Sequence, residues 1–310
     1  MSSLDSDYSL IKQGKVKTAY KSPSNPDNIM FDFSDRISAF DVIIPTDIPK
    51  KGENLRDFAK FFFDNLNVPH HLIETVGSTK MIVKKLDMIP VECIVRGYLY
   101  GGLFDRVNND EIEVDCDNVL ATKLPEPIFD PTTKSDIKDE PITESEIISQ
   151  KIISEEELNY LKNTSIDIYK KILDMASKSG FLIADLKLEF GKDESGNILL
   201  ADSIGPDEFR LWSLAKYEVG KTQESYDKQI LRDWLIDSGY KKQLDNARKN
   251  KSSEDYFLAG RNTPWWVAMF SIVATETSVL TFVSIPGLAY RSDWFFLQLA
   301  FGYIVGRILV

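Results

Sequence analysis

A stretch in which charged and apolar residues alternate, followed by a turn and a second apolar run, constrains this chain most. It extends from Phe181 to Trp212, and Asp185, Lys187 and Glu189 supply its alternating charges. The apolar residues between and beside them are Ala184, Leu186, Leu188 and Phe190. Because successive side chains of a strand point to opposite faces, the stretch predicts a β-hairpin with one charged and one apolar face.

The register of this hairpin predicts a site for a divalent cation. Residues 191–197 have the composition of a turn, and a second strand is expected at 198–204. A turn centred on residues 195–196 places Glu189 directly opposite Asp202, with Cβ atoms about 4.5–5.5 Å apart. Two carboxylates this close repel each other unless a cation lies between them, and Mg²⁺ suits such a pair beside substrate phosphates. The alternative is an exposed hairpin whose charges are solvated.

Composition limits the partners and the compartment. The chain has 310 residues, of which 43% are hydrophobic, enough for one large domain or two smaller ones. The net charge of -11 argues against nucleic acid or an anionic membrane as the main partner. The two cysteines, Cys93 and Cys116, indicate a reducing compartment, and the adjacent His70 and His71 are expected to be structural or surface residues. The first residues show no secretory signal, so a cytoplasmic location is expected.

Basic residues near the N-terminus predict a phosphate contact. The motif GKVKTAY, residues 14–20, is a glycine turn that enters a strand with Lys15 and Lys17 on one face. Glycine allows close backbone approach, and two lysines at this spacing suit a phosphate; an exposed strand edge is the alternative. Further strands are expected at 28–33 and 39–44, and a helix at about 54–66.

Two strands are expected between Lys80 and Gly102, joined across residues 87–90, because Pro90 cannot donate to a ladder. Two strands linked by a short hinge below a lysine-bearing β-layer resemble an adenine-binding cleft between two lobes. Arg96 is expected in an Arg-Gly-Tyr turn at the end of the second strand, where it faces an anionic substrate or forms a surface ion pair.

The middle of the chain predicts a loop and two helices. Residues 124–136 contain three prolines and predict an irregular, extended loop. Two capping boxes start helices, Thr143 with Glu146 and Ser154 with Glu157, and the second helix ends at Gly180. An apolar stripe on that second helix predicts a core-facing side formed by Leu158, Leu161, Tyr169, Ile172, Leu173 and Ala176.

After the hairpin, a turn at 206–210 presents Arg210, and a helix is expected at 225–235. Lys228 and Arg232 lie four residues apart and therefore share one face of this helix. That face is either solvated or lines the cleft.

These motifs, in this order, resemble the SAICAR synthetase family. They are GKVKTAY, DRISAFDV, IPKKGENL, VKKLDMIPVECIVRGYLYG, LPEPIF, IADLKLEFG, DSIGPDEFRLW and SYDKQILRDWL, all within about residues 8–240. The resemblance implies an α+β fold of two lobes with an ATP-grasp- or kinase-like cleft. It implies an ATP-dependent ligase of purine biosynthesis that joins L-aspartate to carboxyaminoimidazole ribotide, releasing ADP and phosphate. Such chemistry depends on positioning and on charge neutralisation by Mg²⁺ and lysines.

The resemblance also implies roles for individual residues. The nucleotide, ATP, would be bound by Lys15, Lys17, Lys84, Leu86 and Met88. The ion, Mg²⁺, would be bound by Glu189 and Asp202. Catalytic contacts to the ribotide and its reacting carboxylate would come from Asp185 and Lys187. The remaining substrate contacts would come from Arg96, Arg210, Lys123, Lys134 and Lys228, with Asp35 and Ser38 as lesser candidates.

Three positions depart from the family pattern. Gly102 stands where many members have serine, Ser203 follows Asp202 where a second acid is frequent, and Lys138 replaces a usual histidine. Each departure removes a side chain that would contact a substrate or ion, while the rest of the expected apparatus is present.

The residues from about 250 onward do not resemble this family. Residues 264–283 form an apolar run with one charge, Glu276, and about 20 such residues suffice to cross a bilayer. Residues 293–310 form a second, shorter run. This part resembles the start of a sodium:solute symporter, which predicts two hydrophobic helices. A mis-joined gene is favoured over a natural membrane tether or a coincidental amphipathic tail.

The expected organisation is a β-rich ATP-binding lobe at 1–90, a substrate- and Mg²⁺-binding lobe at 91–245, and the symporter-like tail at 246–310. The expected partners are small molecules, with no nucleic acid, a membrane only through the tail, and a homo-oligomer left open. Two rival functions are a membrane-transport component with a regulatory N-terminal part and a kinase-like protein with another acceptor. Arg96, Lys187 and Arg210 favour the ligase because together they fit a phosphorylated, carboxylated acceptor.

Overall fold

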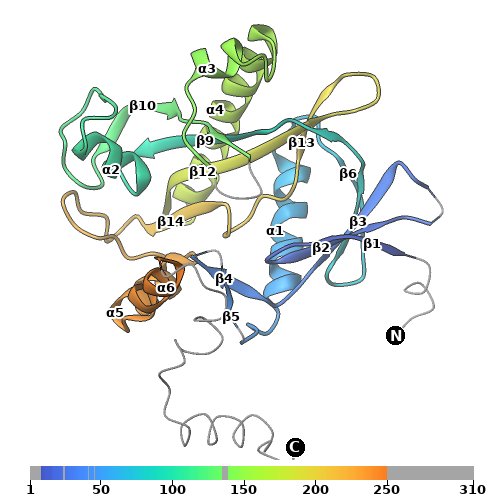
Figure 1. Cartoon of the computed structure of the whole chain (residues 1–310), viewed down its shortest axis with the longest axis horizontal. Helices are drawn as coiled ribbons and strands as arrows, with labels where there is room; N and C mark the ends of the chain where they lie inside the picture. The colour runs from blue at the N-terminus through green and yellow to red at the C-terminus, as the bar shows by residue number, and fades with distance from the viewer. Residues whose placement is uncertain (1–7, 24, 41, 45, 135–138, 250–310) are drawn as a thin grey trace, which may run out of the picture. The chain divides into compact units, whose positions relative to one another are not determined.

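The computed structural model describes residues 8–249 except 24, 41, 45 and 135–138 (Figure 1). The chain divides into two compact units, residues 1–238 and 239–310. The first unit contains two large β-sheets with helices packed on them. The described part of the second unit is helix α6, Tyr240–Lys249. A mixed α/β fold is therefore confirmed, whereas the two apolar runs of the expected tail lie outside the described residues.

The first sheet is antiparallel and has the strand order β1-β2-β3-β7-β6. Its strands are β1 (Ser9–Gln13), β2 (Lys17–Lys21), β3 (Asn28–Phe33), β6 (Leu72–Val76) and β7 (Lys80–Lys84). Helix α1 (Lys51–Asn65) packs on this sheet and buries Leu55, Ala59, Phe62 and Phe63. The sequence predicted β3 with its observed bounds.

Helix α1 begins three residues earlier than predicted because a distant carboxylate caps it. Asp35 accepts the backbone N–H of Lys50 at 3.2 Å and of Gly52 at 2.9 Å. Gly52 also packs tightly on β3, since a Cβ there would lie 2.5 Å from the carbonyl oxygen of Phe33. Both oxygens of Asp35, a lesser substrate candidate, thus accept hydrogen bonds at a helix start.

The single strand predicted at 39–44 is wrong. Two short strands, β4 (Ile37–Ala39) and β5 (Val42–Ile44), pair with each other instead. Phe40 has a φ of 52°, in the left-handed region, so the chain reverses at this residue rather than continuing as a strand.

The second sheet follows the strand order β10-β9-β12-β13, with β8 and β14 also paired to β12 and β11 paired to β9. Its strands are β8 (Asp87–Met88), β9 (Val91–Tyr98), β10 (Lys123–Phe129), β11 (Thr132–Thr133), β12 (Phe181–Lys192), β13 (Ile198–Ala201) and β14 (Phe209–Ser213). Strand β12 contacts β9, β13 and β14 and lies at the centre of the fold, as Figure 1 shows.

Two predictions for β9 and β10 are wrong. The Arg-Gly-Tyr sequence lies inside β9 rather than in a turn, because β9 pairs with β12 on one side and β10 on the other. The proline-rich segment at 124–136 contains all of β10 except its first residue, and β10 pairs with β9 only at Lys123 and at Ile128–Phe129. The prolines fit because they fall in this break of the ladder or beyond it, where no N–H is required.

The remaining helices are α2 (Gly102–Asn108), α3 (Glu144–Ser149), α4 (Glu155–Lys178) and α5 (Gln229–Asp237). Both predicted capping boxes are present at the starts of α3 and α4. Helix α4 covers one face of the second sheet, with Leu158, Leu161, Tyr169 and Ile172 fully buried as predicted. Helix α5 starts four residues later than predicted, because the Asp227 carboxylate accepts the backbone N–H of Gln229 at 2.6 Å. Within the described ranges no helix is long and apolar enough to cross a membrane.

The two sheets are joined through His71. Its backbone N–H donates to Leu200 O at 3.1 Å, and its Nε2 donates to Asp202 O at 2.9 Å. The imidazole is 4% exposed. Burial, helped by the charge of Lys17, lowers the pKa of His71 to about 3, so the ring is neutral in the folded protein. His71 is therefore structural, as expected.

This histidine gives the fold a pH-dependent stability. The unfolded chain takes up a proton near the ordinary pKa of about 6.5 and the folded chain does not, so stability from His71 is complete above that pH and falls as pH decreases toward 3. Between pH 7 and pH 5 the free energy of unfolding should fall by about 2 kcal/mol through this residue. Urea unfolding of His71→Gln, which keeps a donor, should show a pH slope flatter by that amount. His70→Gln is the matched control and should flatten the slope less; a full wild-type slope in His71→Gln would contradict this prediction.

Candidate active site

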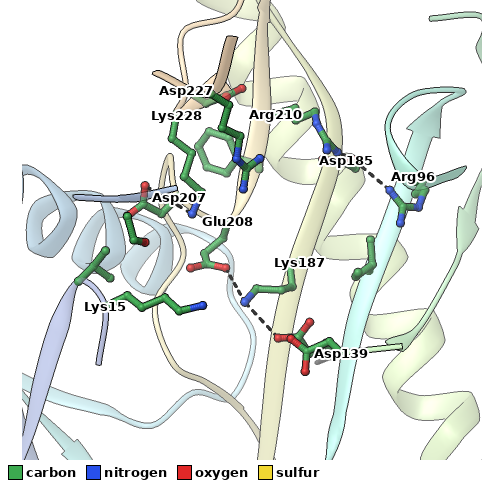
Figure 2. A pocket seen from close by; sticks show the side chains of 17 residues that line it. Lys15, Arg96, Asp139, Asp185, Lys187, Asp207, Glu208, Arg210, Asp227 and Lys228 are labelled. Atoms are coloured by element: carbon green, nitrogen blue, oxygen red, sulfur yellow. Dashed lines mark hydrogen bonds and ion pairs between the residues drawn. The ribbon is translucent and has the colours of Figure 1, made fainter. Parts of the chain in front are cut away.

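A cavity of about 450 Å³ lies along the charged face of β12 (Figure 2). Its cationic lining residues are Lys15, Arg96, Lys187, Arg210, Lys228 and Arg232. Its acidic lining residues are Glu92, Asp139, Asp185, Asp207, Glu208 and Asp227. The alternation predicted for this strand thus places Asp185 and Lys187 in the cavity, and the face is neither solvated nor apolar.

Lys187 lies among three carboxylates. Its Nζ is 3.0 Å from Glu208 Oε2, 3.2 Å from Glu92 Oε1 and 3.7 Å from Glu189 Oε1. Burial alone would lower the pKa of Lys187, but these carboxylates together raise it well above its ordinary value. Lys187 is therefore a fixed cation at neutral pH and cannot accept a proton as a general base. It can stabilise negative charge that develops beside it.

Glu208 is the acid that accompanies Lys187 and was missed from the sequence. Burial alone would raise its pKa, but Lys187 and Lys228 outweigh burial and lower it, so the carboxylate stays ionised. The motif DSIGPDEFRLW could have pointed to Glu208, because this glutamate directly precedes Phe209 at the start of β14.

A chain of alternating charges crosses the other end of the cavity. Asp185 accepts from Arg210 and, at 3.2 Å, from Arg96 Nη1, and it lies opposite Arg96 in the pairing of β12 with β9. Arg96 Nε in turn donates to Asp130, whose other oxygen accepts from Arg106 Nη2 at 2.5 Å. We call these five residues the charge ladder. Arg96, Asp130 and Asp185 are each less than 10% exposed, and each of them is paired with an opposite charge.

Close packing fixes the guanidinium of Arg210. It lies over the Tyr100 ring, 5.7 Å from the ring centroid, and against Gly101, where a Cβ would be 2.7 Å from Nη2. Its Nε is buried without a hydrogen-bond partner in the described part of the chain. A buried donor of this kind at a cavity wall suits an anionic ligand.

The hairpin register differs from the prediction by one residue. Glu189 lies opposite Ala201, not Asp202, because Asp193 pairs with Asn197 across a three-residue loop. The Asp193 carboxylate stabilises that loop by accepting the N–H groups of Ser195 and Asn197, both at 2.9 Å. Asp202 follows β13 with a φ of 59°.

Each predicted metal ligand contacts a lysine. Glu189 binds Lys134, and Asp202 binds Lys17, whose Nζ also donates to Ser203 Oγ at 3.0 Å. The serine that replaces a second acid thus contacts the phosphate-binding candidate. Within the described ranges there is no cluster of three or more His, Cys, Asp or Glu side chains that could hold a metal ion.

The nucleotide candidates lie in the bend before β2, on the first sheet and at the joint between the sheets. Lys15 lines the cavity, and Lys17 lies over the ring of Phe31 at 4.9 Å. Lys84 pairs with Asp193 at 3.0 Å. The expected joint at 87–90 contains β8, which pairs with β12 and leaves Met88 39% exposed. Leu86 packs against Gly191, where a Cβ would lie 2.7 Å from the leucine Cβ.

Some of the remaining substrate candidates line the cavity and others do not. Lys228 and Gly102 line the cavity, as does Arg232, which settles the earlier alternative in favour of a cleft-lining face. Lys123, at the start of β10, does not line the cavity. Lys134 is not a lining residue either, but it forms an ion pair with Glu189. Lys138 lies outside the described residues.

Comparison with known proteins adds independent evidence. The sequence matches the SAICAR synthetase family over residues 10–247. A phosphoribosylaminoimidazole-succinocarboxamide synthase from Nitrosopumilus maritimus (strain SCM1) is 50% identical over 242 residues, covering 77% of this chain and 87% of that protein. The same enzyme from Candida maltosa is 37% identical over 255 residues, covering 76% and 86%.

Solved structures show the same similarity. SAICAR synthase from Saccharomyces cerevisiae, complexed with SAICAR, superposes with a TM-score of 0.68 at 32% identity, covering 77% of this chain and 87% of that one. A type-2 SAICAR synthetase in complex with ADP gives a TM-score of 0.61 at 30% identity, covering 71% and 89%. The family match ends at residue 247, before the two apolar runs of the expected tail.

Proposed function

The chain belongs to the SAICAR synthetase family, and we propose that its reaction takes place in the cavity along β12. The enzyme is a phosphoribosylaminoimidazole-succinocarboxamide synthase of purine biosynthesis. It joins L-aspartate to carboxyaminoimidazole ribotide through an amide, at the expense of ATP. The γ-phosphoryl group first moves to the ribotide carboxylate, and the aspartate amine then displaces that phosphate.

The main support for placing the reaction in this cavity is that Lys187 lies among three carboxylates, with the charge ladder beside it. Phosphoryl transfer to a carboxylate brings two anions together, so a permanent cation beside the reacting atoms lowers the barrier. Arg96 and Arg210 provide guanidiniums for the phosphate or carboxylate of the ribotide, at a site where Asp185 already holds them in place. The same three cations favour the ligase over a kinase with another acceptor.

The nucleotide is proposed to bind against the first sheet. Lys15 and Lys17 lie where phosphates would approach the cavity, and Leu86 and Met88 lie at the joint where an adenine would rest. The proposed lobes are accordingly residues 1–90 for ATP and 91–245 for the acceptor and Mg²⁺. A relative solved in complex with ADP supports nucleotide binding by this fold.

The residues fit Mg²⁺, which would be held by Glu189 and Asp202. Glu189 is 5% exposed, and each carboxylate has a lysine ammonium on its oxygens, the position that another cation would take. Hard oxygen ligands of this kind, completed by phosphates and water, are what Mg²⁺ prefers. The ion would supply charge neutralisation at the nucleotide phosphates. Lys17 and Lys134 would then be released to bind anions.

Asp202→Asn tests the metal assignment. Asparagine tolerates the left-handed backbone of this position, so the fold should persist while one charged ligand is lost. We expect the Mg²⁺ concentration for half-maximal activity to rise at least about 10-fold, measured by Mg²⁺ titration of ADP release. Asp64→Asn, which removes an exposed acid paired with Lys60, is the control. An unchanged Mg²⁺ requirement in Asp202→Asn would refute the assignment.

The proposed function is tested by ADP release from the full chain. ATP, Mg²⁺ and carboxyaminoimidazole ribotide are supplied with and without L-aspartate. Release that requires aspartate, together with formation of the amide product, supports the ligase. Release that is independent of aspartate would favour the kinase-like alternative.

A further inference from the structure

The turn between β1 and β2 carries two of the proposed phosphate contacts, Lys15 and Lys17. Gln13 of β1 pairs with Thr18 of β2, so residues 14–17 connect the two strands, and we call them the lysine turn. Strand β1 lies at the edge of the first sheet, and all five of its residues are exposed. An edge strand without buried side chains gives the lysine turn little support, so the position of the turn depends on other contacts.

Arg36 supplies two of these contacts. Its Nη2 atom carries two N–H groups and donates to Gly14 O at 3.1 Å and to Thr18 Oγ1 at 3.3 Å. One guanidinium therefore bridges the first residue of the lysine turn and the residue that directly follows the turn. Both acceptors are neutral oxygens, and hydrogen bonds from a charged donor are stronger than those between neutral groups. Arg36 thus fixes the separation of the two ends of the turn.

Other hydrogen bonds close the lysine turn. The backbone N–H of Gly14 donates to Lys17 O at 2.8 Å, and a Cβ on Gly14 would lie 2.9 Å from the same oxygen. Ser34 donates twice to Val16 O, from its backbone N–H at 2.9 Å and from its Oγ at 2.8 Å. The backbone of the turn is therefore bound to the protein at three of its carbonyl groups, while the Lys15 side chain reaches into the cavity (Figure 2).

The segment that carries Arg36 is itself fixed. The Asp35 carboxylate accepts N–H groups at the start of α1, and the Asp35 carbonyl oxygen accepts the N–H of Ile48 at 2.9 Å. Ile37, the next residue after Arg36, is 7% exposed and starts β4. Arg36 therefore links the lysine turn to a rigid part of the fold.

The guanidinium of Arg36 is held there although one of its donors is not satisfied. Its Nε is buried and has no hydrogen-bond partner in the described part of the chain. A buried donor in this state is unfavourable for stability, and such a group calls for an explanation. The bridge from Arg36 to the lysine turn provides one, if that bridge serves ligand binding.

We propose that Arg36 is a positioning residue for nucleotide binding, which holds the lysine turn so that Lys15 and Lys17 meet the phosphates together. This inference rests on the proposed function, since that function places the phosphates of ATP at these two lysines. Arg36 acts through the turn and touches no substrate. A lysine ammonium is a point charge, so its attraction depends on its distance from the phosphate, and a displacement of about 1 Å weakens binding substantially.

Full-length Arg36→Gln tests the proposal, by calorimetric titration with ATP and by steady-state kinetics. The Kd and the KM of ATP should rise about 10-fold, because two hydrogen bonds from a charged donor are lost. The KM of the ribotide should change little. The Ki of adenosine, which has the base and no phosphate, should also change little, whereas a general loosening of the fold would raise it as well. Arg36→Lys should be intermediate, because its ammonium can donate to both oxygens from a shorter side chain.

Thr18→Val tests the same bridge from its other end. It removes one acceptor and keeps Arg36, and valine suits a strand such as β2. The Kd of ATP should rise about threefold, as expected for one hydrogen bond. In the double variant with Arg36→Gln the two effects should not add, because both changes break one bridge.

Arg56→Gln is the matched control. Arg56 also donates to a carbonyl oxygen between two strands of the first sheet, Ser78 O at 3.0 Å, and it does not line the cavity. Its Kd for ATP should equal that of the wild type. A folded Arg36→Gln protein that binds ATP as tightly as the wild type overturns the proposal, and so does an equal rise in the Ki of adenosine.

The two levels of the argument can fail separately. A wild-type chain that binds ATP but shows no aspartate-dependent ADP release overturns the ligase function alone, and the Kd of Arg36→Gln still decides the role of Arg36. A wild-type chain that binds no ATP overturns the proposed nucleotide site together with this inference.

Discussion

Lys187→Met is expected to lower kcat about 10²- to 10³-fold, the largest kinetic effect that the structure predicts. Methionine keeps the length and apolar stem of lysine and removes the cation. Glu92, Glu189 and Glu208 would then face one another without a counter-charge, and the reacting phosphoryl group would meet three carboxylates. The measurement is aspartate-dependent ADP release at saturating substrates, with thermal unfolding recorded to show that the protein is folded.

Lys192→Met is a closely matched control. Lys192 ends the same strand, its side chain is 32% exposed against 31% for Lys187, and it pairs with Glu157 away from the cavity. Its kcat should stay within about twofold of wild type. A folded Lys187→Met enzyme that retains more than a third of wild-type kcat would show that Lys187 is not beside the reacting atoms.

Asp185→Asn is expected to lower the free energy of unfolding by about 3 kcal/mol. Asparagine has nearly the same shape but no charge, so Arg96 and Arg210 lose the carboxylate that they share. Both guanidiniums are largely buried, and they would repel each other across the cavity. Urea unfolding measures the loss.

Added inorganic phosphate should restore part of this stability, because an anion between the two arginines replaces the missing carboxylate. Asp174→Asn, which breaks an exposed pair with Lys178, should change stability little and show no such response to phosphate. If Asp185→Asn unfolds at the urea concentration of the wild type, the charge ladder does not hold the two arginines in the way described.

Local signals in the sequence predicted much of this fold. The capping boxes at Thr143 and Ser154 were confirmed because a cap depends only on residues three positions apart. The alternation along β12 was confirmed, since Asp185 and Lys187 line the cavity while Leu186 and Leu188 lie in the hydrophobic core, and a strand has period two. These patterns also predicted that Asp185 and Lys187 would share one face.

The errors arose where a side chain distant in sequence, or a turn, decided the outcome. The hairpin register slipped by one residue because the Asp193 carboxylate favours a three-residue loop, and residue types alone did not reveal this. Asp35 caps helix α1 by accepting the N–H of Lys50, which lies fifteen residues later in the chain. The link from Asp130 to Arg106 and Arg96 joins three separate elements and has no local signature.

The contact between Lys17 and Asp202 has a consequence for biosynthesis, since it spans 185 residues of chain. The first sheet is complete at Lys84, but β12 is not made until about a hundred residues later. At roughly 5–20 residues per second, a ribosome needs about 5–20 s for that interval. Throughout that time the nascent chain presents Lys17 over Phe31 without its acidic partner and an N-terminal sheet without the strand of Leu200 that His71 joins. The nucleotide side of the site is therefore synthesised well before it can be completed, and premature termination before residue 181 would yield a chain that lacks Lys187.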